Sequence, residues 1–110
     1  YGFFELVEEI YSKAMKAFFQ LDLKLANEAA QKAEDADLIA SNLTEKIFMT
    51  IQRCSQDPTA YNVPNLNYYL SLRTIIGTLE RIADHCSTVC ELTINRYLEE
   101  PSEICRFETA

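Results

Sequence analysis

Three acidic residues in the later half of the chain are spaced so that they share one face of a helix. Glu80 and Asp84 are four positions apart, and Glu91 follows seven positions later. Side chains at these spacings lie on the same side of an α-helix, where like charges four apart repel one another. A bound cation is one thing that would offset this repulsion. Helical bundles build sites for hard metal ions from carboxylates held between their helices.

A fourth acid reaches the same level if the chain forms a helical hairpin. A helix that ends near position 55 and another that begins near position 65 place Asp37 level with Glu80 and Asp84. We therefore predict that any bound divalent or iron cation contacts Asp37, Glu80 and Asp84. Oxygen-only ligands favour iron, manganese, magnesium or calcium. The alternative is a solvated acidic face without metal, which is the commoner use of charged residues on surface helices.

The only histidine, His85, does not complete a catalytic pattern. A carboxylate-bridged iron enzyme would have glutamate three positions earlier, where Ile82 stands, and a phosphorelay histidine would have lysine three positions later, where Thr88 stands. We therefore expect a structural, hydrogen-bonded role for His85. Cys86 and Cys90 fall on an apolar stripe and are expected to be small buried hydrophobes rather than zinc ligands. The sequence contains no nucleophile elbow, dinucleotide-binding glycine pattern or phosphate-binding loop, and we predict no enzymatic activity.

Three long amphipathic segments are needed to position these residues. Apolar residues recur every three or four positions over residues 2–20, 22–55 and 65–99, which is the spacing of α-helices. Long helices joined by short connections favour an up-down-up bundle like that of a spectrin repeat. We therefore predict an all-α fold in which residues 1–110 form a single domain.

Local signals set the boundaries of the predicted helices. Asp22 is a good N-cap between the first two helices, residues 56–64 contain two prolines, and Pro101 is expected to end the third helix. The first helix is shorter than the other two, although such a bundle packs best with matched lengths. Because the chain also starts at Tyr1, we expect it to be a fragment of a longer chain that lacks the upstream half of this helix.

Composition and charge exclude several classes of function. Hydrophobic residues make up 48% of the chain, enough to fill one core, and the formal net charge is −7. A negative field of this size repels nucleic acid and anionic membrane surfaces, so we expect no direct nucleic-acid binding. The sequence shows no signal peptide and no apolar run long enough to cross a bilayer, which predicts a cytoplasmic protein that is not inserted in a membrane.

The segment Thr78–Cys86, TLERIADHC, resembles the L-E-R-I-[GA]-D-H-A signature that the PhoU family carries on a late helix. The run Asp22–Ala26 with the later Asp37 is similar to the family's D-x-x-L-A and downstream acid, and Tyr68–Leu70 is similar to archaeal members. The similarity in pattern covers most of the chain, although only the nine-residue signature is specific. The chain therefore looks like a single archaeal-type PhoU repeat.

The resemblance implies control of phosphate uptake by contact with a transporter, a sensor kinase or a fused DNA-binding domain. It also implies a multinuclear metal cluster, but this chain has Ala33 where the family has a carboxylate and Thr88 where it often has asparagine. Family members generally carry two repeats, which implies a second repeat or a partner chain here. The alternative is a generic helical oligomerisation or partner-binding module with no metal and no phosphate role.

The predicted third helix carries more apolar surface than two neighbouring helices need. Ile75, Ile82 and Val89 lie beside its main apolar stripe. We therefore predict a homodimer or higher oligomer, because an isologous contact between two copies would bury this face and recreate a six-helix arrangement.

Overall fold

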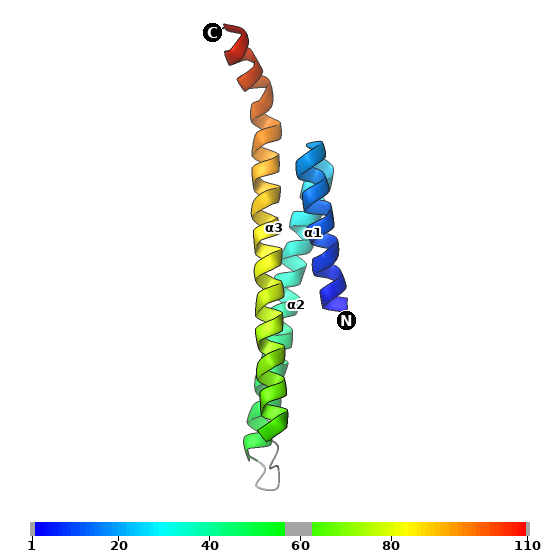
Figure 1. The fold of residues 1–110 in the computed structure, drawn as a ribbon, viewed down its shortest axis with the longest axis vertical. Helices are drawn as coiled ribbons and strands as arrows, with labels where there is room; N and C mark the ends of the chain where they lie inside the picture. The colour runs from blue at the N-terminus through cyan, green and yellow to red at the C-terminus, as the bar shows by residue number, and fades with distance from the viewer. Residues whose placement is uncertain (1, 57–62, 110) are drawn as a thin grey trace.

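The computed structural model describes the backbone of residues 2–56 and 63–109 and the side chains of residues 2–53 and 66–99. Three helices make up this part of the chain: α1 (Gly2–Gln20), α2 (Leu23–Gln56) and α3 (Val63–Thr109). Consecutive helices run antiparallel, so α1 and α3 point the same way, in a rod with extents of 76 × 22 × 17 Å. Figure 1 shows α1 lying against only part of the α2–α3 hairpin, with the two long helices continuing past its first residue. The predicted up-down-up three-helix bundle is confirmed.

The connection between α1 and α2 is closed by backbone hydrogen bonds around Asp22. Leu21 has a φ of 52°, in the left-handed region, and this allows the Asp22 amide to bond the Ala17 carbonyl at 3.0 Å. This bond from the residue after the left-handed position is the helix-ending Schellman arrangement. The Asp22 carboxylate then accepts a bond from the Leu25 amide at 3.2 Å, which confirms the predicted N-cap. One residue therefore ends α1 and starts α2.

The core is built around an alanine stripe on α2. Because alanine side chains are small, the axes of α1 and α3 can approach α2 closely and exclude water along its length. Larger side chains from α1 and smaller ones from α3 complete the buried set. The buried hydroxyl of Thr93 donates a hydrogen bond to the Val89 carbonyl at 2.8 Å. The buried hydrophobic residues are Phe3, Val7, Ile10, Ala14, Ala17, Ala26, Ala29, Ala33, Ala36, Ala40, Ile47, Ile76, Ala83, Cys86 and Cys90.

Ion pairs join α1 to α2 at the edge of this core. Lys32 contacts Glu9 at 2.7 Å, and Lys13 contacts Glu28 at 3.5 Å. The hydrogen bond from Lys32 lowers the pKa of Glu9, and the same bond raises the pKa of Lys32. Both pairs are exposed enough for solvent to screen them, so they orient the two helices more than they stabilise them.

The third helix is longer than predicted at both ends. It begins at Val63 instead of residue 65, because Pro64 fits the first turn of a helix, where no amide donor is needed. The prediction that Pro101 ends the helix is wrong, since α3 continues to Thr109. A proline inside a helix removes one backbone hydrogen bond and bends the axis without always ending it. Figure 1 shows the last turns of α3 leaning away from the axis of the bundle.

Candidate functional site

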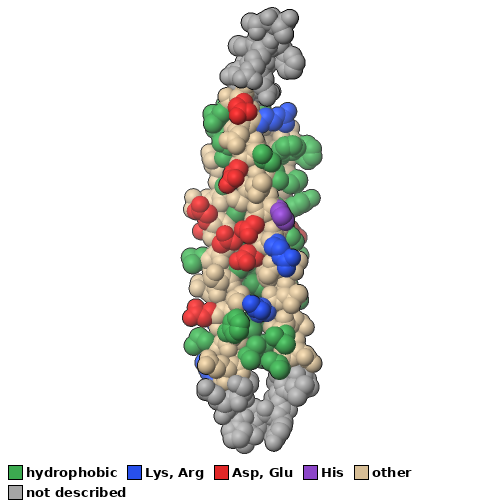
Figure 2. Space-filling model, turned by 90° about the vertical axis from the view of Figure 1, so that its left-hand side faces the viewer, with side chains coloured by type: hydrophobic (Ala, Val, Ile, Leu, Met, Phe, Trp, Pro, Cys, Tyr) green, Lys and Arg blue, Asp and Glu red, His purple; other side chains and the backbone are tan. Residues whose placement is uncertain are grey.

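The structure brings the three predicted acidic residues together between α2 and α3. Asp37 of α2 lies close enough to Asp84 and Glu80 of α3 for the charges of both carboxylates to act on it. Counting residues from the hairpin turn thus placed them at the correct level. Figure 2 shows acidic side chains gathered midway along one face of the molecule.

Carboxyl groups held close together resist ionising at the same time. Desolvation between the helices raises the pKa of Asp37 above its ordinary value of 3.8, and the negative charges of Asp84, Glu80 and Glu34 raise it further. None of the ion pairs among the described side chains involves Asp37, Glu80 or Asp84. The cluster is therefore a concentration of negative charge without a protein counter-ion.

The donors of this cluster do not form a complete metal site as they stand. Across residues whose side chains are described, no group of three or more His, Cys, Asp or Glu is arranged to hold a metal ion. Ala33, four positions before Asp37, is 3% exposed and supplies no oxygen ligand. The residues present do not fit a multinuclear cluster, and a single cation at Asp37, Glu80 and Asp84 stays a prediction.

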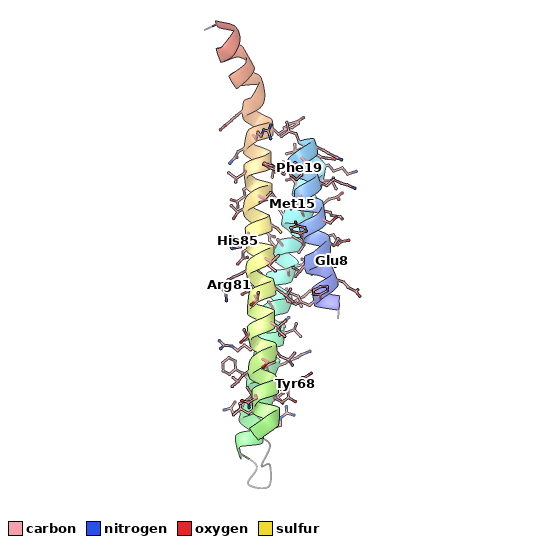
Figure 3. The ribbon with its side chains drawn as sticks, in the orientation of Figure 1. Glu8, Met15, Phe19, Tyr68, Arg81 and His85 are labelled. Atoms are coloured by element: carbon pink, nitrogen blue, oxygen red, sulfur yellow. The ribbon has the colours of Figure 1, made fainter. Side chains whose placement is uncertain are left out.

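The remaining residues considered in the sequence take different places. Glu91 is exposed on α3, farther along the helix from the cluster. The expectation of a hydrogen-bonded structural histidine is wrong for this structure, because His85 is exposed and none of the hydrogen bonds between described residues involves its ring. Figure 3 shows His85 and Arg81 on the side of α3 turned away from α1. Adjacent residues on a helix point in different directions, so His85 is exposed although the next residue, Cys86, is buried.

Cys86 and Cys90 are both buried and free, as expected for small core hydrophobes. Burial raises the pKa of both thiols, and the neighbouring Cys86 and Glu91 raise that of Cys90 further. They are therefore protonated at neutral pH and poorly suited to nucleophilic attack.

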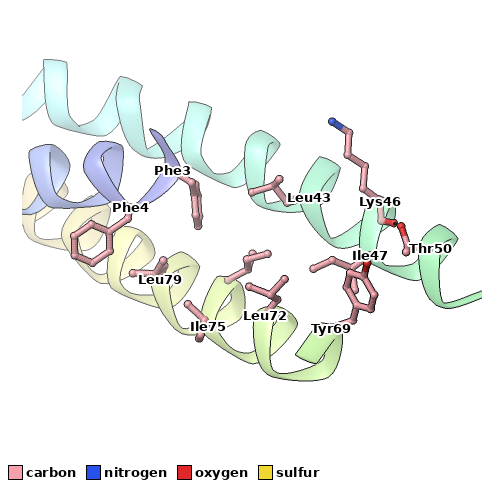
Figure 4. A pocket seen from close by; sticks show the side chains of 11 residues that line it. Phe3, Phe4, Leu43, Lys46, Ile47, Thr50, Tyr69, Leu72, Ile75 and Leu79 are labelled. Carbon is pink, nitrogen blue, oxygen red and sulfur yellow. Dashed lines mark hydrogen bonds between the residues drawn. The ribbon is translucent and has the colours of Figure 1, made fainter. Parts of the chain in front are cut away.

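An apolar groove on the α1 side of the molecule was not predicted. It has a volume of about 440 Å³ and lies between α2 and α3 where α1 begins. Figure 4 shows Phe3 at one end of it, with Leu43 and Ile47 of α2 facing Leu72 and Ile75 of α3. The signal in the sequence was the apolar stripe of the two long helices, which continues beyond the length that the first helix can cover.

Comparison with known proteins identifies the family of the chain. A family model described as the PhoU domain matches residues 2–93. The chain belongs to the PhoU domain family. No curated protein and no solved structure matches it significantly.

The match contains the whole acidic cluster and the groove of this PhoU domain, and it ends within α3. The signature residues Glu80 and Asp84 are the ones that meet Asp37 across the hairpin. Within the described residues, no helix of the domain is both long and apolar enough to cross a membrane.

Replacing Asp37 with asparagine should stabilise this PhoU domain at neutral pH. Because the folded-state pKa of Asp37 is raised, the native state binds more protons than the unfolded state between pH 3.8 and that raised pKa. The free energy of unfolding therefore falls as pH rises through this window, and above it the ionised Asp37 destabilises the native state to its full extent. Urea unfolding across pH should show an advantage for Asp37→Asn at pH 7 that disappears below pH 3.8.

The control for this experiment is Glu99→Gln, which removes one acid from an exposed position on α3 outside the cluster. It should change stability little at any pH. A pH-independent difference between Asp37→Asn and the wild type would contradict the cluster as the cause.

Manganese should bind the acidic cluster weakly, because three carboxylates attract a hard cation but Ala33 leaves the ligand set incomplete. Calorimetric titration of the wild type and of Glu80→Gln plus Asp84→Asn tests this prediction. We expect heat that saturates only for the wild type. Equal heats for both proteins would remove the metal site and leave the fold unaffected.

Proposed function

We propose that the chain is a regulatory module that controls phosphate uptake by contact with a transporter, a sensor kinase or a DNA-binding domain fused to it. The observation that carries the proposal is the PhoU domain match over residues 2–93. A module of this kind acts by presenting surfaces to partners instead of performing chemistry. The proposal places it in the cytoplasm, as expected from the sequence.

The exposed apolar side chains of the bundle support a role in binding other proteins. Phe4 and Tyr11 of α1 and Ile75 and Ile82 of α3 are each more than a third exposed. Large apolar side chains kept at a surface beside one another mark sites of protein association. The same surface supports the second candidate, a helical oligomerisation module without a phosphate role, so the phosphate response decides between them.

Deleting the gene in its own organism should abolish the response of phosphate uptake to supply. Uptake of radiolabelled phosphate would be measured in phosphate-rich and phosphate-starved cells, with the wild-type gene restored as the control. We expect the two conditions to differ in the parent and in the complemented strain but not in the deletion strain. A deletion strain that still adjusts its uptake normally would favour the oligomerisation module.

We further propose that two copies associate through the outer face of α3. Ile82 is 38% exposed and Val89 is half-buried, although both lie on a helix that already packs against α1 and α2. An isologous contact would remove this face from water in both copies.

Light scattering at micromolar concentration should therefore give the mass of a dimer for the wild type. Ile82→Asp should give a monomer with the same helical circular dichroism, because it places a charge in the contact without touching the core. A wild-type monomer would contradict the association.

A further inference from the structure

Two apolar lines, one on α1 and one on α3, border each other on the outside of the bundle. Arg96 of α3 lies over the Phe18 ring of α1 at 5.9 Å, so the sides of the two helices that carry these residues are neighbours. On each helix the same side returns every seven positions, close to two helical turns. We call this surface the α1–α3 face. Its apolar residues, all exposed or half-buried, are Phe4, Tyr11, Phe18, Ile75, Ile82 and Val89.

The charged residues of the α1–α3 face are divided between the two helices by sign. Glu5 and Glu8 are three positions apart on α1, and Arg81 and His85 are four positions apart on α3. All four are exposed, and none of the ion pairs between described side chains involves them. Figure 3 shows Glu8 on one edge of the face and Arg81 and His85 on the other. The face therefore has an acidic edge on α1 and a basic edge on α3.

The acidic and basic residues also lie at matching levels along the bundle. Phe3 and Leu79 line the same groove, and Arg96 reaches the ring of Phe18. A residue of α1 is therefore level with the α3 residue about 76 to 78 positions later. The pairs that share a level are Glu5 with Arg81 and Glu8 with His85.

Two symmetric arrangements of two copies would bury this face. A two-fold axis parallel to the helices places α1 of each copy on α3 of the other at the same level, so that Glu5 and Glu8 meet Arg81 and His85 twice in each dimer. A two-fold axis across the helices places α1 on α1 and α3 on α3, so that carboxylates meet carboxylates. Like charges placed together disfavour a contact, and opposite charges favour it. The charge pattern therefore selects the first arrangement.

We propose that two copies of the chain pack side by side and parallel, with the acidic edge of α1 in each copy against the basic edge of α3 in the other. The proposal rests on the association through α3 proposed above and specifies which surface of the second copy covers it. The line of α1 that contains Tyr11 would remove Ile82 and Val89 of the other copy from water. The paired edges would offset, at the contact, the long-range repulsion between two chains of net charge −7.

Charge reversal on the two edges tests this arrangement on the 110-residue chain. The acidic-edge variant is Glu5→Lys plus Glu8→Lys, and the basic-edge variant is Arg81→Glu plus His85→Glu. A combined variant carries all four substitutions. Sedimentation equilibrium measures the dissociation constant of each dimer, and circular dichroism verifies that each variant is folded.

We expect each single-edge variant to weaken dimerisation about tenfold, because every dimer exchanges its attractive contacts for repulsive ones. The combined variant has edges of opposite sign again, so it should dimerise like the wild type. The differences between variants should shrink in about 1 M salt, where the screening length is about 3 Å.

Net charge alone predicts the opposite result for the acidic edge. Each glutamate-to-lysine change adds two charges, so the acidic-edge variant has a net charge of −3 instead of −7 and would dimerise more tightly if long-range repulsion governed association. The control Glu45→Lys plus Glu91→Lys makes the same change in net charge at exposed positions outside the face. It should dimerise at least as tightly as the wild type.

Three results would overturn the proposal. One is a wild type that stays monomeric at every concentration measured, which would also contradict the association through α3. The others are an acidic-edge variant that dimerises as tightly as the control, and a combined variant that stays as weak as the single-edge variants. If Ile82→Asp still dissociates the dimer, these two results overturn only the arrangement. None of the three depends on the phosphate response, so failure here is distinct from failure of the proposed function.

Discussion

Burial of the alanine stripe on α2 is the interaction on which the rest of the structure depends. Ala26, Ala29, Ala33, Ala36 and Ala40 are all nearly inaccessible to solvent. Small side chains allow both neighbouring helices to come close, and the gain in packing is spread along the whole length of the contact. The closeness of α2 and α3 at this stripe is also what brings Asp37 near Asp84. A larger core residue here would separate the helices and the two carboxyl groups together.

Periodicity and capping made most of the fold predictable from the sequence. The spacing of apolar residues located all three helices, Asp22 marked the boundary between the first two, and the hairpin register placed Asp37 opposite Asp84. Each of these inferences uses a local rule with a fixed geometric period. The continuation of α3 through Pro101 could not be inferred, because proline predicts where a helix is weakened and not whether it stops.

Only the part of the site that depends on the register of the α2–α3 hairpin could be predicted from the sequence. The direction in which His85 faces depends on how α3 is rotated against both partners, and position along the helix alone does not determine that rotation. The groove depends on the difference in length between α1 and the hairpin, which becomes a surface only when the three helices are assembled.

The continuity of α3 gives the molecule a mechanical property. Its 47 residues form one helix of about 70 Å, and α1 and α2 hold only part of that length. A stiff rod held over one segment converts rotation into displacement at its ends. Tilting such a rod by about 5° about the middle of its length moves either end by about 3 Å, roughly half a helical turn. A small adjustment in the packing of the bundle therefore reaches the end of α3 as a shift large enough to change side-chain contacts there.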